Sequence, residues 1–447
     1  MSTITPHTAQ PSRRDVLKTS AVAAGVLAGQ LVVPQAVHAG GSELLRVGLI
    51  GCGGRGTGAA IQALSADPNA ILVAMGDAFE DRLQSSLASL RRPRRATTQP
   101  AQAEAEPRWA AQVKVDPDHC FVGLDAYQKV IDSGVDVVLL ASPPAFRPIH
   151  LKAAVAAGKH VFCEKPIAVD APGVRSVLET AEEAQRKGLS LVSGFCWRYS
   201  LPERAIMRRI HDGAVGQVHT FYGTYNTGPL WMHPRQPQWT DLEWQLRNWL
   251  YFTWLSGDHI VEQCVHEIDK MAWVMNDRSP VSAWGTGGRQ VRTDPAYGHI
   301  YDHFAVVYEW GDGVRGFIYC RQQAGCANDI SNHIAGSAGM ADIEGFRPRH
   351  VISGRESWRY EGPRNNMYQQ EHDELFRSIR DGKPMNDGRF MANSTMIAIL
   401  GRMAAYTGQS VSWEMAINSQ ESLVPAQLEW GPMPMPEVPM PGRTKLV

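Results

Sequence analysis

The feature that most constrains the fold is a glycine-rich turn at residues 51–56, which reads Gly-Cys-Gly-Gly-Arg-Gly. It follows an apolar run at residues 44–50 and precedes residues 57–64, which have helical character. Strand, G-x-G-x-x-G and helix in this order mark the first turn of a doubly wound parallel sheet, where the glycines let backbone and helix N-terminus approach a pyrophosphate. The residues expected to contact a dinucleotide here are Gly51, Gly53, Gly54, Arg55 and Gly56.

An acidic residue ends the second predicted strand. Residues 70–77 are mostly apolar and finish in Asp77. An acid at this position accepts hydrogen bonds from ribose hydroxyls and repels a 2′-phosphate. Arg82 follows shortly after and is compatible with a 2′-phosphate. We therefore expect NAD as the cofactor, with NADP less favoured.

Two further apolar runs, residues 135–141 and 159–163, extend the same sheet. Their composition is typical of buried parallel strands. Ligands of open α/β sheets bind beyond the carboxyl ends of the strands, so the residues after each run should face the cofactor. These residues are Ser142, Pro143, Glu164 and Lys165. We expect a Rossmann dinucleotide-binding domain over residues 44–170.

Residues 1–39 have the layout of a bacterial export signal. Arg13 and Arg14 precede a mildly apolar run at residues 21–33, and residues 37–39 form a small-residue cleavage site. The paired arginines indicate the twin-arginine route, which typically exports proteins already folded around a cofactor. A membrane anchor is the alternative, but the run is shorter than the roughly 20 residues that span a bilayer. We expect a periplasmic or extracytoplasmic protein with a tightly held cofactor and no stable membrane anchor.

Charge and cysteine usage exclude several classes of partner. The chain has 44 Lys and Arg against 45 Asp and Glu, which leaves no electrostatic footprint for nucleic acid. Its seven cysteines include no C-x-x-C pair, which argues against a zinc ribbon or a thioredoxin-type site. A small molecule is the expected partner. Residues 90–107, rich in Arg, Pro, Ala and Gln, are interpreted as an exposed insertion.

Four ionisable side chains recur at helical spacing. His259, Glu262, His266 and Asp269 lie at offsets that share one face of a helix, among largely apolar neighbours, which favours a site over a solvated surface. A metal site is the alternative, because two imidazoles and a carboxylate could act as ligands. Zinc helices usually carry histidines four residues apart, whereas these are seven apart, so no metal is expected.

The chemistry of hydride transfer gives these residues roles. Oxidation of a carbinol by a nicotinamide needs a base for the hydroxyl proton and a donor that stabilises the developing alkoxide. A histidine suits the first task because its ordinary pKa is about 6.5. The ammonium of Lys165 suits the second. Tyr199 is a further acid/base candidate, with simple packing as the alternative.

With these motifs the chain resembles the Gfo/Idh/MocA family, the glucose–fructose oxidoreductase and inositol dehydrogenase group of sugar oxidoreductases. The matching motifs are the glycine loop, Cys-Glu-Lys-Pro at residues 163–166, Trp-Arg-Tyr at 197–199, and E-x-x-x-H-x-x-D at 262–269. The resemblance covers residues 45–410. The family usually carries Asp where this chain has Glu262, and its approach to the motif is richer in glycine.

The resemblance implies a fold and a site. It implies an N-terminal Rossmann domain and a C-terminal α+β domain whose large, mostly antiparallel sheet covers the nicotinamide with one face. It assigns catalysis to Lys165 and His266, with Glu262 or Asp269 orienting His266 or binding a sugar hydroxyl. It also implies dimers or tetramers that form through the open face of the sheet.

The second half of the chain fits such a domain. Residues 218–225, 303–310 and 315–320 partly alternate apolar and polar side chains, as strands of a one-sided sheet do. A substrate and catalytic domain is therefore expected over residues 190–410.

Two helices and an extended segment are expected to follow. Residues 369–380 are interpreted as a surface helix that carries Glu371 and His372, with a position of these two side chains at the site as the alternative. Residues 393–407 are interpreted as a second helix ending at a glycine. Residues 411–447 are rich in proline and are expected to form an extended tail across a surface or a neighbouring subunit.

These features together predict an exported NAD-dependent oxidoreductase that acts on a sugar, polyol or glycoside at a secondary carbinol. An NAD-recycling glycosidase of the same fold, working by oxidation and elimination, is the alternative, and a non-enzymatic sugar sensor is a third. An exported enzyme meets no free NAD pool, so the cofactor must be recycled within one active site.

Overall fold

The computed structural model describes residues 44–92, 108–345, 347 and 349–446. The expected export signal and most of the expected insertion at 90–107 lie outside these residues. Within the described ranges, every helix is too short or too polar to cross a bilayer.

The first sheet has six parallel strands in the order β3-β2-β1-β4-β5-β6. Its strands are β1 (Leu45–Ile50), β2 (Ala70–Asp77), β3 (Cys120–Val122), β4 (Val137–Leu140), β5 (His160–Cys163) and β6 (Leu191–Ser193). The helices around it are α2 (Gly54–Ala66), α3 (Glu80–Arg91), α4 (Ala126–Asp132), α5 (Arg147–Ala156) and α6 (Ala171–Arg186). The predicted Rossmann fold is confirmed, and β6 extends its sheet beyond residue 170.

The second sheet has nine strands in the order β14-β13-β12-β11-β7-β10-β9-β8-β15. Among the described strands of this sheet, only β7 and β10 pair in parallel, so the prediction of a mostly antiparallel sheet is confirmed. The strands are β7 (Val218–Thr227), β8 (Ser282–Gly288), β9 (His303–Glu309), β10 (Arg315–Gln322), β11 (Asp329–Gly336), β12 (Gly339–Glu344), β13 (Arg349–Gly354), β14 (Trp358–Arg359) and β15 (Val411–Ser412).

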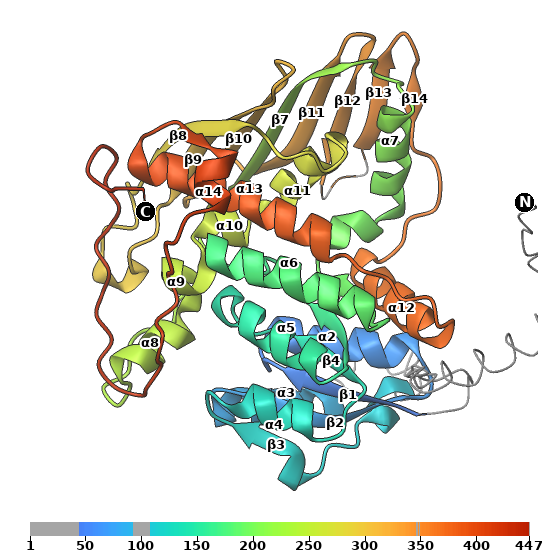
Figure 1. Cartoon of the computed structure of the whole chain (residues 1–447), viewed down its shortest axis with the longest axis vertical. Coiled ribbons are helices and arrows are strands. Elements are labelled where there is room, and N and C mark those ends of the chain that lie inside the picture. The colour runs from blue at the N-terminus through green and yellow to red at the C-terminus, as the bar shows by residue number, and fades with distance from the viewer. Residues whose placement is uncertain (1–43, 93–107, 346, 348, 447) are drawn as a thin grey trace, which may run out of the picture.

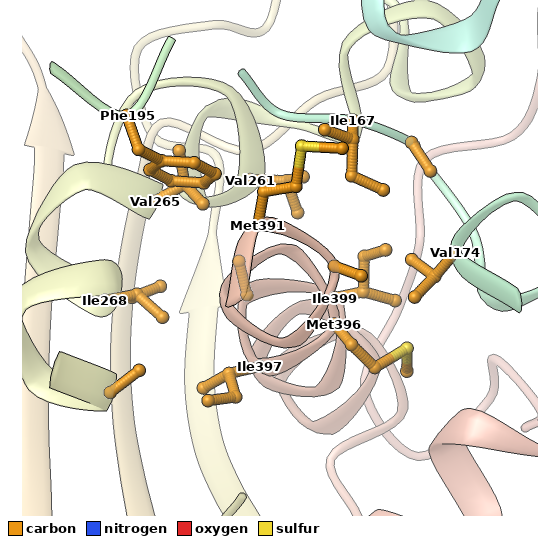
Figure 2. Close-up of a cluster of buried hydrophobic side chains, with 14 of the residues drawn as sticks. Ile167, Val174, Phe195, Val261, Val265, Ile268, Met391, Met396, Ile397 and Ile399 are labelled. Atoms are coloured by element: carbon orange, nitrogen blue, oxygen red, sulfur yellow. The ribbon is translucent and has the colours of Figure 1, made fainter. Parts of the chain in front are cut away.

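One long helix joins the two sheets. α13 (Gly388–Thr407) is buried around nearly its whole circumference, as a helix that is apolar on all sides must be. It lies between α6 of the first domain and the second sheet (Figure 1). In Figure 2, its side chains sit between Val174 of α6 and Ile268 of α11 (Val265–Val274). The two domains therefore share one continuous hydrophobic core.

The chain returns to the first domain after the second sheet. α12 (Met367–Arg380) packs on α2, and the residues before α13 close the edge of the first sheet. There the Leu191 amide donates to the Met385 carbonyl at 2.8 Å, and the Asp387 amide donates to the Leu191 carbonyl at 2.9 Å. The first domain is thus completed by residues from far along the sequence.

A separate apolar cluster lies to one side of both domains. It combines α8 (Asp241–Arg247), α9 (Thr253–Ser256) and the segment between them with residues 423–433 of the chain. The remaining helices are α7 (Leu201–His211), α10 (His259–Glu262) and α14 (Trp413–Ile417). After α14, residues 418–446, here called the Pro-rich segment, run without helix or strand past α8 (Figure 1).

Candidate active site

The glycine loop has the shape that dinucleotide binding requires. Gly51 has a φ of +96°, and a Cβ there would come within 2.5 Å of the Ser142 amide nitrogen. A Cβ at Gly56 would overlap the Gly51 carbonyl oxygen. By contrast, apart from adjacent residues and the backbone of α2 itself, no atom of the described structure lies within 4 Å of the Cβ position at Gly53 or Gly54. Two glycines therefore close the turn, and the other two leave open space in which a pyrophosphate fits.

Asp77 at the end of β2 lies beside this loop. Its carboxylate accepts hydrogen bonds from the Cys52 amide at 2.6 Å and from the Phe79 amide at 2.9 Å. Burial raises the pKa of Asp77. The acid is thereby fixed next to the glycine loop, where a ribose would bind.

The ends of β4 and β5 complete the same edge of the sheet. Ser142 Oγ lies 3.1 Å from His150 Nδ1, and Pro143 begins the short turn that follows. Burial lowers the pKa of His150 to about 3, so its ring is neutral. Glu164 and Lys165 follow β5 directly. The four residues predicted to follow these strands therefore lie at the carboxyl edge of the first sheet, where a dinucleotide would bind.

Arg55 and Glu164, both expected to face the cofactor, are paired with each other. Arg55 Nε lies 2.6 Å from Glu164 Oε1, and Arg55 Nη2 lies 3.5 Å from Glu371 Oε1 on α12. Glu371 and its neighbour His372 are fully buried, so the expectation of a surface helix is wrong. The reason is that α12 covers α2, which no local pattern in residues 369–380 reveals.

Lys165 is held by Glu262. Lys165 Nζ donates to the Glu262 backbone carbonyl at 2.7 Å and to Glu262 Oε1 at 3.2 Å. The lysine side chain is 13% exposed and the glutamate side chain 8%. Glu262 Oε2 is buried and has no hydrogen-bond partner within the described residues. An ammonium with this support keeps its position, and the free carboxylate oxygen can accept a further hydrogen bond.

His266 lies on the next turn of the chain. Its Nδ1 atom is buried without a hydrogen-bond partner in the described structure, and its ring meets the Phe195 ring edge to face. Burial and the nearby ammonium groups of Lys165 and Lys270 lower the pKa of His266 well below 6.5. The imidazole is therefore neutral near pH 7 and can accept a proton.

The prediction of a single helical face from His259 to Asp269 is wrong. α10 is one turn long and ends at Glu262, and α11 starts at Val265. The Cys264 amide bonds the His259 carbonyl, a spacing of five residues that rotates the following turns as a π-type bulge does. His259 consequently faces Phe304 of β9, with ring centroids 5.0 Å apart, and is fully buried.

Asp269 does not orient His266, which corrects the expectation for it. Its Oδ1 atom lies 2.8 Å from Arg198 Nη2 and accepts from Ser394 Oγ at 2.7 Å, while Oδ2 accepts from Arg198 Nε at 3.0 Å. The carboxylate is 2% exposed and fully used by this ion pair. Because of the bulge between α10 and α11, Asp269 faces Ser394 of α13 rather than Lys165.

Tyr199 is likewise not placed for proton transfer to a substrate. It is 2% exposed, and its hydroxyl donates to Asp387 Oδ2 at 2.5 Å. Burial and the Asp387 carboxylate raise the pKa of the Tyr199 hydroxyl. The alternative given for Tyr199, a side chain that is simply packed in the interior, agrees with these contacts.

The structure adds Tyr225 and Gln263 to the site. The Tyr225 hydroxyl, from β7, donates to Gln263 Oε1 at 3.0 Å. Burial and the nearby Glu262 carboxylate raise the pKa of Tyr225. In the sequence, Gln263 could be linked to the site only because it follows Glu262. Tyr225 could be assigned to a predicted strand, but no motif linked it to the site. Among the described residues, no three His, Cys, Asp or Glu side chains are arranged to hold a metal ion.

Comparison with known families agrees with this geometry. Residues 45–192 match the model described as "Oxidoreductase family, NAD-binding Rossmann fold", and residues 204–342 match the "GFO/IDH/MocA C-terminal domain". An inositol 2-dehydrogenase of Rhizobium meliloti is 27% identical over 307 residues, which cover 68% of this chain and 77% of the relative. One from Serratia proteamaculans is 31% identical over 228 residues, covering 49% of this chain and 60% of the relative.

Solved structures show the same fold. An aldose–aldose oxidoreductase from Caulobacter crescentus superposes with a TM-score of 0.62 at 17% identity, covering 83% of this chain and all of the other. A levoglucosan dehydrogenase in complex with NADH and levoglucosan superposes with a TM-score of 0.62 at 18% identity, covering 83% of this chain and 99% of the other. The glycine loop, the lysine after β5 and both matched domains lead to one conclusion: the chain belongs to the Gfo/Idh/MocA family of NAD-dependent oxidoreductases.

Proposed function

We propose that this enzyme is exported and transfers hydride at a secondary carbinol of a sugar, polyol or glycoside, with its NAD recycled inside one active site. The observation that carries the proposal is the arrangement of Lys165, Glu262 and His266, in which a fixed ammonium stands near a neutral imidazole. The paired Arg13 and Arg14 support export.

The cofactor would be held along the carboxyl edge of the first sheet. The glycine loop would bind the pyrophosphate, Asp77 the ribose hydroxyls, and the turns after β4 and β5 the nicotinamide half. A carboxylate at the ribose favours NAD over NADP. NAD, when bound, accepts a hydride from a carbinol or returns one to a carbonyl.

The reaction itself would be carried by two side chains. The Lys165 ammonium donates a hydrogen bond to the substrate oxygen and stabilises the negative charge that develops there. His266 takes the hydroxyl proton during oxidation and returns it during reduction. Glu262 holds the lysine, and its free Oε2 accepts a hydrogen bond from a neighbouring sugar hydroxyl.

The substrate class is supported by the relatives. Two of them are named inositol 2-dehydrogenases, which favours a cyclic polyol or pyranose as the hydride donor. The Caulobacter neighbour is named an aldose–aldose oxidoreductase, a reaction in which one sugar is oxidised and another reduced. Such coupling suits an exported enzyme, because no external NAD is consumed.

The open face of the second sheet supports a dimer or tetramer. Tyr222, Trp284, Tyr319 and Met340 are all large, apolar or aromatic, and exposed there. Strand register places them on one side of the sheet, on β7, β8, β10 and β12. Light scattering after gel filtration would test this assembly, and a monomer at micromolar concentration would contradict it.

The function is tested on the purified exported protein. Its absorbance spectrum, and that of the supernatant after denaturation, shows whether a nicotinamide accompanies the chain. Cyclic polyols and aldoses are then added singly and in pairs while the reduced-nicotinamide band and sugar products are followed. One turnover with a single sugar and many with a pair are expected, and Lys165→Met should slow both strongly.

The NAD-recycling glycosidase is distinguished in the same assay. It would release the aglycone from a chromogenic glycoside through many turnovers with no second sugar present. That outcome would replace the oxidoreductase by the glycosidase. A protein without affinity for NAD would overturn both.

A further inference from the structure

The turn that follows Asp77 is contacted from outside its own domain. The Arg247 guanidinium of α8 lies 4.0 Å from the Phe79 ring centroid. The ring of Trp430, in the Pro-rich segment, lies 5.8 Å from the same ring. Phe79 comes two residues after Asp77, so both contacts fall at the adenosine end of the cofactor crevice.

Ion pairs hold this arrangement in place. Arg247 forms two hydrogen bonds with Asp81, each 3.0 Å long, and a third with Glu243 at 2.9 Å. These carboxylates neutralise the guanidinium and leave its flat face against the Phe79 ring. Beside them, Arg82 Nη2 lies 3.1 Å from His233 Nε2 in the segment that leads to α8. Arg82, the residue compatible with a 2′-phosphate, is thereby engaged with a protein group.

A surface cavity of about 790 Å³ lies at the centre of these contacts. Its walls include Phe79, Val122 and Gly123 from the ends of β2 and β3, and Arg247 and Trp430 from outside the domain. The volume falls within the range of roughly 300–1,000 Å³ that is usual for small-molecule sites. The cavity therefore lies beside the turn that follows Asp77, between the first domain and the α8 and Trp430 side chains that cover this turn.

The Pro-rich segment is tied down along its length. The Leu242 amide donates to the Gly431 carbonyl at 3.2 Å, and Gln245 Nε2 donates to the Met433 and Pro434 carbonyls at 3.3 Å each. Further along, the Tyr301 hydroxyl donates to the Pro439 carbonyl at 2.8 Å. Trp430 is thus carried by a backbone that is fixed to α8 and to the second domain.

We propose that α8 and the Pro-rich segment form a clasp over the adenosine end of the crevice and make NAD a resident cofactor that exchanges slowly. The inference rests on NAD binding and is independent of which sugar the enzyme uses. For a bound dinucleotide to leave, the Arg247 and Trp430 contacts with the turn after Asp77 must first open. Removing either contact should speed release and leave the catalytic residues untouched.

The test measures release of NADH from the full-length protein. The protein is loaded with NADH, freed of excess by gel filtration and mixed with a large excess of NAD⁺ as a trap, while nicotinamide fluorescence is followed. Trp430→Ala and Arg247→Met should each release NADH at least tenfold faster than the wild type. The fraction of NAD that copurifies should be lower with each of these two variants than with the wild type.

Matched controls separate the clasp from general loosening. Trp358→Ala removes an indole that packs on Arg209 at the far edge of the second sheet, and Arg278→Met removes an exposed arginine that pairs with Asp312 in the second domain. Both should keep the wild-type rate within twofold. Clasp variants that are folded by circular dichroism yet release NADH at the wild-type rate would overturn the proposal, as would control variants that release it equally fast.

Discussion

Two clusters of charged side chains flank α10 and α11, and they differ in how completely their polar atoms are paired. The lysine cluster consists of Lys165, Glu262 and His266, and Glu262 Oε2 and His266 Nδ1 have no hydrogen-bond partner in the part of the chain that the structure describes. The arginine cluster consists of Arg198, Asp269, Asp277 and Ser394. In it both Asp269 oxygens are hydrogen-bonded, and Arg198 pairs with both aspartates.

The difference supports the chemical role proposed for the lysine cluster. Buried polar atoms in folded proteins are nearly always paired, because an unpaired one costs about 1–3 kcal/mol. The arginine cluster follows that rule and stabilises the junction of α11 with α13. The lysine cluster departs from it at the edge of the cofactor crevice, where a substrate hydroxyl would supply the missing partner. Residue type alone does not separate the two, since each contains a cation and a carboxylate.

The sharpest way to test the comparison is His266→Gln. Loss of the group that takes the hydroxyl proton should lower kcat/KM by roughly 10²–10⁴-fold. NADH affinity should stay within threefold, because His266 lies beyond the glycine loop. Steady-state kinetics with the best substrate of the panel, together with fluorescence titration of NADH, measure both. A loss below tenfold would remove His266 from the lysine cluster's chemistry.

Asp269→Ala tests the other cluster. It leaves the Arg198 guanidinium buried with one carboxylate fewer, and breaking such a pair costs about 3–5 kcal/mol of unfolding free energy. Urea denaturation measures this loss, and kcat of the folded fraction should stay within threefold of the wild type. As a control, Asp312→Ala breaks a mostly exposed pair with Arg278 and should cost less than about 1 kcal/mol. An Asp269→Ala protein of wild-type stability but without activity would reverse the roles of the clusters.

Lys165→Met keeps the length of the side chain and removes its charge. Loss of the group that stabilises the developing alkoxide should lower kcat by roughly 10²–10³-fold, as removal of one oxyanion donor does in other enzymes. The effect should appear in kcat more than in KM. Single-turnover reduction of bound NAD, followed by absorbance, isolates this step. An effect confined to KM would make Lys165 a binding residue only.

The smallest effect concerns pH. Burial holds the pKa of His266 well below 6.5 in the folded protein, whereas the unfolded chain takes up the proton near 6.5. The unfolded state therefore binds more protons below that pH, and stability falls as the pH falls. Between about pH 7.5 and about pH 5.5 the wild type should lose about 1 kcal/mol more than His266→Gln. Urea melts at both values measure the difference, and equal losses would show that His266 is not buried in its neutral form.

The parts of the fold that local sequence determines were predictable. The glycine loop and Asp77 act within one strand–turn–helix unit, so their spacing was enough to place them at the sheet edge. Lys165 was placed correctly after β5 for the same reason. The mostly antiparallel sheet followed from alternating strands together with the family resemblance.

The remaining assignments depended on contacts that no local pattern carries. The bulge at Gln263 and Cys264 contains neither Gly nor Pro, and it turned His259 and Asp269 away from the expected face. Tyr199 finds its partner Asp387 at a separation of 188 residues. In both cases helical spacing or a motif identified the right residue types, and tertiary packing decided their roles.

The closure of the first sheet by residues 385–387 also bears on how the chain is made. Ser193 of β6 donates its amide to Asp387, 194 residues further along, so the edge of this sheet stays open until that part of the chain has left the ribosome. An open edge strand invites pairing with other chains. The nascent protein therefore passes through a long stage in which its first domain is incomplete, and it should depend on chaperones until α12 and α13 arrive.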